Sequence, residues 1–331
     1  MKPLISVIIP TYNEEQHIRR CLNSLLKQDL KEPYDIIVAD GMSTDRTRDI
    51  VKEYQAKHGN VVLLDNKEKH QAQGRNLAIR KSRAGFVAYI DGHSYASKSW
   101  LRTLYDTYKR LSAEDPHVGG VGSIHKDAGR TRMSKATTAA MNSVLGGGLG
   151  SSYSEKKDLK RVDTAYACLF PKKVFEELGW YDKRFLKGQD LEFNLRVSKA
   201  YNLYLQPKAV TYYYKRDSSK KLWNQMYRYG FWRWKVMKHA RRWQPFALAP
   251  AAAVIGWLGL GAGTVATGEG WLLAPLAAHL AALLGGSGVV SAAKKTNPWY
   301  VLITYLCIHF GYGTGTVAGW VKRTDKTRDR A

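Results

Sequence analysis

The feature that most constrains the fold is a short apolar run, residues 86–90, which follows a glycine and leads directly into Asp91-Gly92-His93. A short run of apolar, β-prone residues of this kind is typical of a buried strand in a parallel sheet. Ligands of open α/β sheets bind just beyond the carboxyl ends of strands, so Asp91 and His93 are expected to face a ligand crevice. A carboxylate oxygen and an imidazole nitrogen could hold a divalent cation there, together with a diphosphate. The alternative is a helix-capping aspartate followed by a loop histidine.

Strands and helices alternate along the first 90 residues. Three further apolar runs predict strands, at residues 4–9, 34–39 and 61–64. The stretches between them carry apolar residues at helical spacing; one helix is expected from Asn13, as its N-cap, to about Lys27, and another opening at Gly74. This alternation predicts an α/β fold with a parallel, doubly wound sheet and right-handed crossovers. No G-x-G-x-x-G or Walker sequence is present, which disfavours dinucleotides and P-loop ATP binding.

Two more acids lie near predicted strand ends. Asp40 follows the run 34–39, and Glu14 comes soon after the first strand. A carboxylate at such a position could accept the imide N–H of a uracil ring, which would select a uridine nucleotide. The alternative is that Asp40 and Asp45 cap turns and helices.

The second half of the charged region holds a candidate catalytic base. A strand is predicted at 165–170 and a short helix at 172–178, ended by Gly179. Asp190 then falls in the first turn of another helix, where the helix dipole favours an ionised carboxylate. A general base must be deprotonated before it takes a proton, so Asp190 suits that role. An acid that only satisfies the dipole is the alternative.

The stretch 119–153 is rich in Gly, Ser and Thr. It is expected to be a mobile loop over the site, or else a plain surface linker. The three cysteines, Cys21, Cys168 and Cys307, are far apart in the sequence. Their spacing argues against disulfides or a cysteine-built metal site and suits a reducing compartment.

Charge is distributed unevenly along the chain. Lys and Arg number 52 against 28 Asp and Glu, a net charge of +24, yet residues 246–321 are almost uncharged. Such a basic protein suits nucleic acid, anionic lipid or phosphorylated substrates. The uncharged region contains three segments long enough to cross a bilayer: residues 246–267, 271–293 and 299–321.

Flanking cations predict the orientation of these segments. Arg241-Arg242 precede the first and Lys294-Lys295 follow the second, so the first two should form a hairpin whose outer ends are both cytoplasmic. A third span would export the basic residues that follow it, against the positive-inside rule. The glycines of the third segment could make it re-entrant or interfacial, or the tail could lie outside.

The stretch 215–243 holds ten Lys and Arg and one acid, interleaved with aromatic residues. It predicts a basic amphipathic helix in the membrane interface, in contact with anionic lipids. Nucleic-acid binding by aromatic stacking is the rival interpretation. The neighbouring apolar segments favour the membrane, so no nucleic-acid partner is expected.

Together, the motifs resemble family 2 inverting glycosyltransferases of the GT-A fold, over roughly residues 3–235. The resemblance rests on five pieces in order: Ser6–Glu15, Ile36–Asp45, Gly74–Asn76, Ala84–His93 and Gly188–Glu192. Within that family the chain is most similar to the membrane-attached enzymes of exopolysaccharide assembly, of the succinoglycan type. Those enzymes extend a sugar linked to a polyprenyl diphosphate.

The resemblance implies a role for each matching position. The nucleoside would be held by Pro10, Tyr12, Glu14 and Asp40, with Asp40 on the base. Asp91 would be the first acid of the D-x-D metal motif, Asp190 the catalytic base, and Arg75 a partner of the metal in neutralising the diphosphate. The segment Gln225 to Tyr229 resembles the Q-x-x-R-W motif of processive members, with Arg228 in the arginine position and Tyr229 in place of the tryptophan.

The chain also departs from the family pattern. Gly41 replaces the usual second acid after Asp40, and His93 takes the third D-x-D position, which should shift the metal preference from Mg²⁺ toward Mn²⁺. Gln189 stands where many members have a glutamate before the base. The tyrosine at position 229 leaves processivity open.

These observations predict a cytoplasmic GT-A domain (1–214), a basic interface helix (215–245), a transmembrane region (246–321) and a basic tail (322–331). The expected protein is a multi-pass, metal-dependent inverting glycosyltransferase of the cell membrane. Its donor would be a nucleotide sugar, expected to be UDP-linked, and its acceptor a sugar on a polyprenyl phosphate or diphosphate. The alternatives are a processive polysaccharide synthase and a non-enzymatic basic membrane scaffold or nucleic-acid binder.

Overall fold

The computed structural model describes residues 2–129, 131–147, 158–214 and 218–322. The chain forms two compact units. Residues 1–126 and 152–214 make the first, and residues 127–151 and 215–331 make the second. The predicted basic tail therefore lies outside the described residues, except for Lys322.

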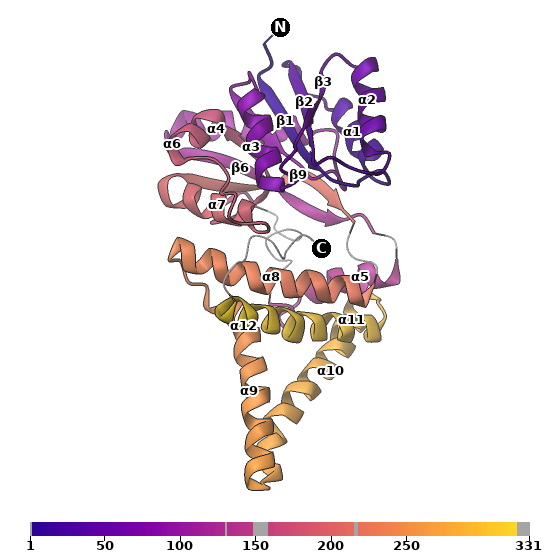
Figure 1. Ribbon diagram of the computed structural model, residues 1–331, viewed down its shortest axis with the longest axis vertical. Coiled ribbons are helices and arrows are strands. Elements are labelled where there is room, and N and C mark those ends of the chain that lie inside the picture. Colours follow the sequence, from indigo (N-terminus) through magenta and orange to yellow (C-terminus); the bar gives the residue numbers. More distant parts are fainter. Residues whose placement is uncertain (1, 130, 148–157, 215–217, 323–331) are drawn as a thin grey trace. The chain divides into compact units, whose positions relative to one another are not determined.

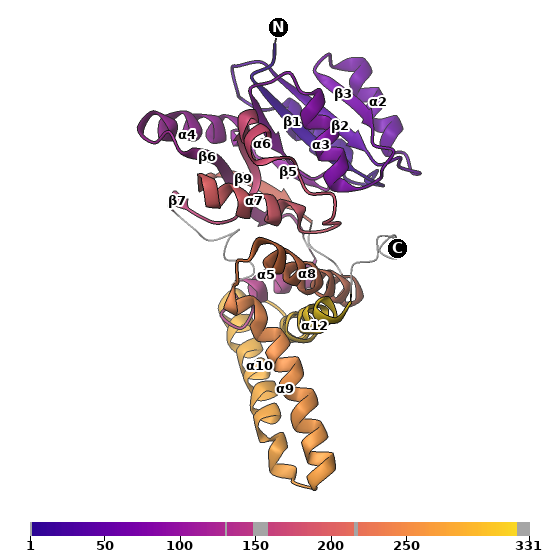
Figure 2. The same cartoon turned by 60° about the vertical axis from the view of Figure 1, so that its left-hand side comes forward.

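The first unit is built on one mixed sheet (Figures 1 and 2). The strand order is β3-β2-β1-β4-β8-β6-β9-β5, with the short β7 pairing with β9. The strands are β1 (Ile5–Thr11), β2 (Tyr34–Asp40), β3 (Val61–Asp65), β4 (Phe86–Tyr89), β5 (Ser94–Ala96), β6 (Val118–Asp127), β7 (Lys160–Arg161), β8 (Tyr166–Pro171) and β9 (Asn202–Tyr213). Strands β3, β2, β1 and β4 are parallel to one another, whereas β8 pairs antiparallel with β4 and with β6.

Two hydrophobic cores cover the two faces of this sheet. Because side chains alternate along a strand, Val7 and Ile9 of β1 enter one core and Ile8 enters the other. The first face packs against α1 (Ile18–Leu26), α2 (Thr47–Lys57) and α4 (Trp100–Glu114). The second packs against α3 (Gln71–Lys81), α6 (Lys172–Leu178) and α7 (Gln189–Ala200). The helices on both faces leave the strand ends as the place where polar side chains can gather.

Three predictions about this unit need correction. The sheet is parallel only in its first half, because the chain returns antiparallel in β8. Asn13 is not an N-cap: its φ is 53°, its Oδ1 accepts the backbone N–H of Thr44 at 2.9 Å, and α1 begins only at Ile18. Helix α3 begins at Gln71 and not at Gly74.

The described part of the stretch 119–153 is also not a loop over the site. It forms strand β6 and helix α5 (Arg132–Met141), whose Thr131 side chain caps the helix by accepting the N–H of Ser134. The glycines of β6 are required by packing: a Cβ at Gly120 would meet the Phe170 ring at 2.5 Å. Small residues here reflect close contact rather than mobility.

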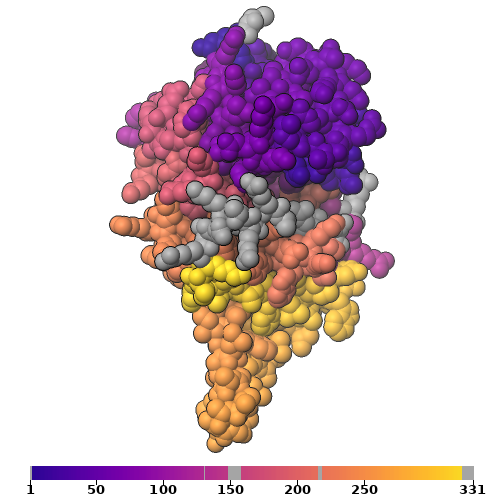
Figure 3. Space-filling model, viewed as in Figure 1, coloured from indigo at the N-terminus to yellow at the C-terminus, as the bar shows by residue number. Residues whose placement is uncertain are grey.

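The second unit consists of helices: α5, α8 (Ser219–Ala240), α9 (Pro245–Thr267), a 3₁₀ turn (Gly270–Leu273), α10 (Ala274–Lys294), α11 (Pro298–Leu306), a π-helical turn (Cys307–Tyr312) and α12 (Gly313–Val321). Helices α9 and α10 form an antiparallel hairpin, while α11 and α12 run beside α8 (Figures 1 and 2). On the face shown in Figure 3, the far end of the orange hairpin projects beyond the other helices of this unit.

Three helical segments among the described residues are long and apolar enough to cross a membrane, at 245–267, 270–294 and 298–321. They differ in burial within the protein. Only 11% of the apolar window is buried in each of the first two, against 56% in the third. Much of the apolar surface of the third segment is therefore buried against other parts of the protein.

Candidate active site

Asp91, two residues beyond the end of β4, is the centre of a polar cluster in the first unit. Its Oδ1 accepts hydrogen bonds from Gln71 Nε2 at 2.9 Å and Arg75 Nη2 at 3.1 Å. Its Oδ2 accepts one from the hydroxyl of Tyr166 at 2.9 Å. Gln71 and Arg75 lie one turn apart on α3, which places both donors on the same side of that helix.

The charge on this carboxylate is stabilised by its neighbours. Burial alone would raise the pKa of Asp91, but Arg75, His93, the Tyr166 hydroxyl and His125 outweigh that effect and lower it. The pKa of the Arg75 guanidinium is raised despite its burial, chiefly by Asp91. Both groups are therefore ionised at neutral pH.

Arg75 lies deeper than its expected role suggests. It is 1% exposed, and its guanidinium stacks over the rings of Tyr89 at 4.5 Å and Tyr181 at 5.2 Å. Such a guanidinium fixes the position of Asp91 and adds positive charge beneath it. This burial favours a supporting role over direct contact with a diphosphate.

His93 follows Asp91 after one glycine, and its Nδ1 lies 2.7 Å from Oε1 of Glu14. A carboxylate on Nδ1 selects the tautomer that coordinates a metal through Nε2, as is common for metal-binding histidines. Gly92 is needed between the two residues, because a Cβ there would meet Cγ2 of Thr11 at 2.9 Å. In the structure, the Glu14 carboxylate therefore contacts the His93 ring.

Whether these residues fit a divalent cation depends on Asp91. Within the described residues, no three or more His, Cys, Asp or Glu side chains converge, so the protein alone does not supply a complete ligand set. An ionised carboxylate has about four acceptor positions, and Asp91 uses three, so a further ligand can still bind Oδ2. The donor types of Asp91 and His93, a carboxylate oxygen and an imidazole nitrogen, suit a cation that would take its other ligands from phosphate and water, as Mn²⁺ and Mg²⁺ commonly do.

Asp40, at the end of β2, is fully buried and already bonded. Its carboxylate accepts the Ser43 N–H at 2.8 Å, the Ser43 hydroxyl at 2.6 Å and the Thr11 hydroxyl at 3.1 Å. Arg48 adds an ion pair at 3.1 Å. These contacts fit the turn-capping alternative. Of the other residues expected at the nucleoside, Pro10 is buried in β1 and Tyr12 is 50% exposed.

Asp190 occupies the first turn of α7, as predicted. Its Oδ1 accepts the N–H of Leu191 at 2.9 Å, and Gly188 before the helix has a φ of 74°. The residue is partly exposed. Its charge raises the pKa of Tyr181, after the larger effect of burial, so it lies near the Arg75 cluster.

A chain of side-chain amides joins the base helix to Asp91. Gln189 Nε2 donates to Gln71 Oε1 at 2.7 Å, and Gln71 Nε2 donates to Asp91. Gln189, which departs from the family's usual glutamate, is 2% exposed. An amide suits this position because it can donate to Gln71, which an ionised carboxylate cannot.

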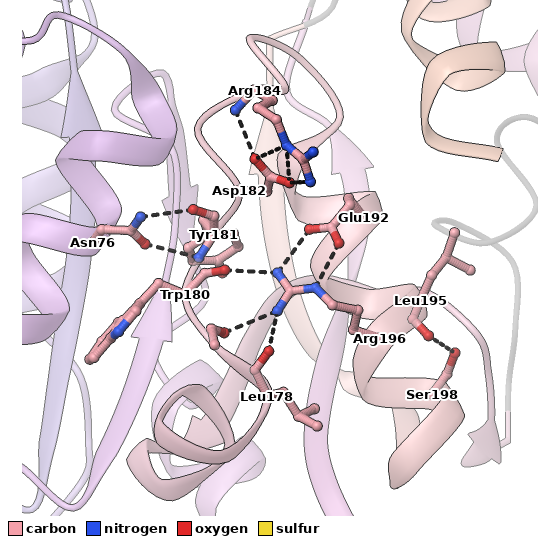
Figure 4. A network of polar contacts seen from close by, with 11 residues as sticks. Asn76, Leu178, Trp180, Tyr181, Asp182, Arg184, Glu192, Leu195, Arg196 and Ser198 are labelled. Carbon is pink, nitrogen blue, oxygen red and sulfur yellow. Dashed lines mark hydrogen bonds and ion pairs between the residues drawn. The ribbon is translucent and has the colours of Figure 1, made fainter. Parts of the chain in front are cut away.

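The start of α7 is fixed by a second network, drawn in Figure 4. Arg196 donates to both oxygens of Glu192 and to the backbone carbonyls of Leu178, Gly179 and Trp180. The side chain of Asn76, on α3, pairs with both backbone polar groups of Tyr181. The turn 178–181 is thereby held between α3 and α7.

Several residues of this arrangement were not predicted from the sequence. Gln71 could have been found, because it lies one helical turn before Arg75. The ion pair of Glu192 and Arg196 could also have been predicted, because the two residues are four apart on a helix. Tyr166 and His125 come from β8 and β6, and their approach to Asp91 depends on the antiparallel half of the sheet.

The processive-type motif lies in the second unit, on α8. Gln225 Nε2 donates to the Tyr229 hydroxyl at 3.0 Å, and Arg228 is exposed. The tyrosine that replaces the family's tryptophan thus accepts a bond that an indole could not, since its N–H only donates. A role for these three residues at the acceptor stays a prediction.

Open α/β sheets bind their ligands beyond the carboxyl ends of their strands, and Asp91 and His93 follow the end of β4 in this way. Residues 6–179 match the model of glycosyl transferase family 2, and the chain belongs to that family. It is therefore a glycosyltransferase, of a family that uses nucleotide sugars as donors.

Two relatives support the assignment to this family, one over 230 residues and one over 328. The chain is 34% identical over 230 residues to dolichyl N-acetyl-alpha-D-glucosaminyl phosphate 3-beta-D-2,3-diacetamido-2,3-dideoxy-beta-D-glucuronosyltransferase of Methanococcus voltae, covering 68% of this chain and 71% of that one. It is 27% identical over 328 residues to succinoglycan biosynthesis protein ExoA of Rhizobium meliloti (strain 1021), covering 93% and 92%.

The fold has a counterpart among solved structures. The mannosyltransferase PcManGT from Pyrobaculum calidifontis, solved in complex with GDP-Man and Mn²⁺, matches with a TM-score of 0.61 and 18% identity. The match covers 97% of this chain and 88% of that one. It supports a GT-A-like fold.

Proposed function

We propose that this chain is a membrane-anchored, metal-dependent inverting glycosyltransferase that moves a sugar from a nucleotide sugar to a lipid-linked acceptor. The observation that carries the proposal is the linked pair of acids, Asp91 and Asp190. Asp91 is ionised and accepts hydrogen bonds from Arg75, Gln71 and Tyr166. Asp190 lies in the first turn of α7, next to Gln189, and Gln189 donates a hydrogen bond to Gln71. The two acids sit in different surroundings and suit different tasks.

Asp190 is the proposed general base. It takes the proton of an acceptor hydroxyl while that oxygen attacks the anomeric carbon of the donor sugar. The bond from the anomeric carbon to the diphosphate oxygen breaks on the opposite face, and the bond pair leaves with the nucleoside diphosphate. A single displacement inverts the anomeric configuration. The partial exposure of Asp190 supports this role, because an acceptor must reach the carboxylate.

Asp91 and His93 are the proposed ligands of a divalent cation, with Mn²⁺ favoured over Mg²⁺ by the imidazole nitrogen. When bound, such a cation supplies Lewis-acid neutralisation of the departing diphosphate. Glu14 holds the His93 ring, and Arg75 holds Asp91, so both ligands are positioned beforehand. The Mn²⁺ complex of the Pyrobaculum mannosyltransferase supports testing this metal first.

The proposed donor is a UDP-sugar. That proposal starts from the acids near the first two strand ends, although Asp40 accepts four hydrogen bonds from three residues of the protein. The Pyrobaculum mannosyltransferase was solved with GDP-Man. GDP-sugars therefore belong beside UDP-sugars in any donor panel.

The proposed acceptor is a sugar on a polyprenyl phosphate or diphosphate. The name of the Methanococcus relative describes transfer to a dolichyl-linked sugar phosphate. The α9–α10 hairpin is proposed to anchor the chain in the cell membrane, with the catalytic domain cytoplasmic because Arg241-Arg242 and Lys294-Lys295 flank its ends. The exposed cations of α8 would meet anionic lipid headgroups.

The test is a donor and acceptor panel with detergent-purified, full-length protein and Mn²⁺. Release of nucleoside diphosphate and formation of glycosylated lipid are measured for UDP- and GDP-sugars, each with a short-chain polyprenyl-linked sugar. Transfer of one sugar that stops in excess EDTA and returns with Mn²⁺ is expected. Transfer at the full rate in excess EDTA would overturn the metal proposal, and transfer to water-soluble sugars alone would overturn the acceptor proposal.

A further inference from the structure

The third apolar segment, residues 298–321, runs beside α8, and the same offset in sequence number relates the paired residues along the contact. Cys307 Sγ lies 3.9 Å from the carbonyl oxygen of Ser219. Every fourth residue after Cys307 repeats the pairing with the same offset in sequence number: Gly311 with Trp223, Gly315 with Tyr227 and Gly319 with Phe231. The two helices therefore run parallel and in contact over more than three turns.

The glycines of this segment are explained by that contact. A Cβ at Gly315 would lie 2.0 Å from the Tyr227 carbonyl oxygen, and one at Gly319 would lie 2.9 Å from that of Phe231. Gly230 of α8 is equally tight against the carbonyl of Tyr312, at 2.0 Å. Small residues on both helices let the two backbones approach closely. The part of α8 that holds Trp223, Tyr227 and Phe231, in the helix predicted to lie in the membrane interface, thus borders the third segment.

The charges of α8 restrict the depth at which this pair can lie. Helix α8 carries six Lys and Arg in 22 residues: Lys220, Lys221, Arg228, Arg233, Lys235 and Lys238. If residues 298–321 crossed the bilayer, α8 would have to cross beside them and bring these cations into the hydrocarbon core. Charged side chains are strongly disfavoured there. The pairing therefore keeps the third segment at the membrane face.

Helix α5 supports the same conclusion independently. Thr137 and Thr304 hydroxyls lie 3.3 Å apart, and the Ser143 and Tyr305 hydroxyls 2.8 Å apart. Apolar side chains of α5 pack on α11 in the same place. Helix α5 begins five residues after the end of β6, and so short a connection cannot cross a bilayer, so α5 stays on the same side of the membrane as β6. α11 must then lie at that side as well.

We propose that only the α9–α10 hairpin enters the depth of the bilayer, and that residues 298–321 lie with α8 and α5 along its cytoplasmic face. This inference rests on the proposed membrane attachment. It places Lys322 on the same side as α8, so the basic residues after position 321 obey the positive-inside rule. Of the three helices long enough to span, the third is then part of a platform at the membrane surface.

Cysteine labelling in intact cells tests the side on which each point lies. Three full-length variants are compared: Lys238→Cys on α8, Glu269→Cys at the hairpin tip and Lys322→Cys. The wild-type protein, whose three cysteines are buried, gives the background. A membrane-impermeant maleimide should label only Glu269→Cys from outside, and all three after permeabilisation.

The outcomes distinguish the placement of residues 298–321 at the membrane face from the proposed membrane anchor. External labelling of Lys322→Cys with Lys238→Cys protected would overturn the inference, because the third segment would then span. If all three variants were protected in intact cells, the hairpin would not cross the membrane, and the proposed multi-pass anchor would be wrong. The inference that Lys238 and Lys322 lie on the same side would still hold.

A cross-link tests the pairing of the helices directly. In Ser219→Cys, copper-phenanthroline oxidation of membranes should join the new thiol to native Cys307, detected by mass spectrometry as a linked peptide. Asn224→Cys, on the exposed side of α8, is the matched control and should give no link to Cys307. Absence of the 219–307 link together with formation of a 224–307 link would overturn the arrangement.

Discussion

Arg196 holds Glu192 through both carboxylate oxygens, at 2.6 Å from Nε and 2.8 Å from Nη2. Glu192 is 2% exposed, and the same guanidinium binds three successive carbonyls of the turn 178–180. Glu192 lies two residues after Asp190 and is the other acid in the first turn of α7 that could act as a base. Its burial and bidentate pairing assign it instead to holding the start of α7.

Arg196→Ala should destabilise the first unit strongly, because it leaves the buried Glu192 carboxylate without a counter-charge. Breaking a buried ion pair by removing one partner costs about 3–5 kcal/mol. The matched control is Arg184→Ala, which breaks the pair of Arg184 with Asp182. The Arg184 side chain is 64% exposed, so this loss should be within about 1 kcal/mol. Thermal melts of the two variants in one detergent should differ clearly; equal melting temperatures would contradict the clamp.

Asp190→Asn should lower turnover by about 10²–10⁴-fold, since the amide keeps the shape but takes no proton. Donor affinity, measured by calorimetry, should barely change. Glu192→Gln is the companion variant, expected to lower the melting temperature with a smaller loss of turnover. Near-normal turnover in Asp190→Asn would move the base elsewhere.

Glu14→Gln should weaken metal binding without removing a ligand. The amide holds the His93 ring less firmly than the carboxylate does, and loss of such a partner typically costs 10–100-fold in metal affinity. Mn²⁺ binding in the presence of nucleoside diphosphate, followed by electron paramagnetic resonance, gives the affinity directly. Glu15→Gln, on an exposed neighbour, is the control. An unchanged Mn²⁺ affinity in Glu14→Gln would show that the contact to His93 does not serve a metal.

Gly92→Ala should damage the site, because its Cβ would lie 2.9 Å from Thr11 Cγ2 and 3.2 Å from Glu14 Cγ. Overpacking of this kind costs about 1–3 kcal/mol and would shift Asp91 and His93 apart. Gly85→Ala, at the other end of the strand, meets nothing within 4 Å and should be neutral. Activity and melting temperature are compared for the pair. Equal behaviour of the two variants would argue that the glycine is not needed for close approach.

The Asp91 carboxylate should make stability depend on acid pH. Its pKa is lowered in the folded protein, because Arg75 and the other donors outweigh the opposing effect of burial. A lowered folded pKa means that the stabilisation is fully present above the unfolded value of about 3.9. It is lost as pH falls below that value, through the folded pKa. The difference in melting temperature between wild type and Asp91→Asn should therefore narrow below about pH 4, and a constant difference from pH 7 to pH 3 would contradict it.

The sequence alone determined the first four strands and the short helix ended by Gly179. These elements are local, and each follows from apolar periodicity and a turn residue within a few positions. The position of Asp190 in the first turn of α7 was determined in the same way. The resemblance to family 2, confirmed by the match over residues 6–179, came from motif order along the chain.

Only the tertiary structure decided which residues surround Asp91. Tyr166 reaches it because β8 pairs antiparallel with β4, a contact between residues about 75 positions apart. The same holds for the glycines at 311, 315 and 319, which in sequence suggested a break in a membrane helix. Their partners on α8 lie about 88 positions earlier. Local propensity contains no information on which surface a small residue will meet, since that is fixed only when two helices pack against each other.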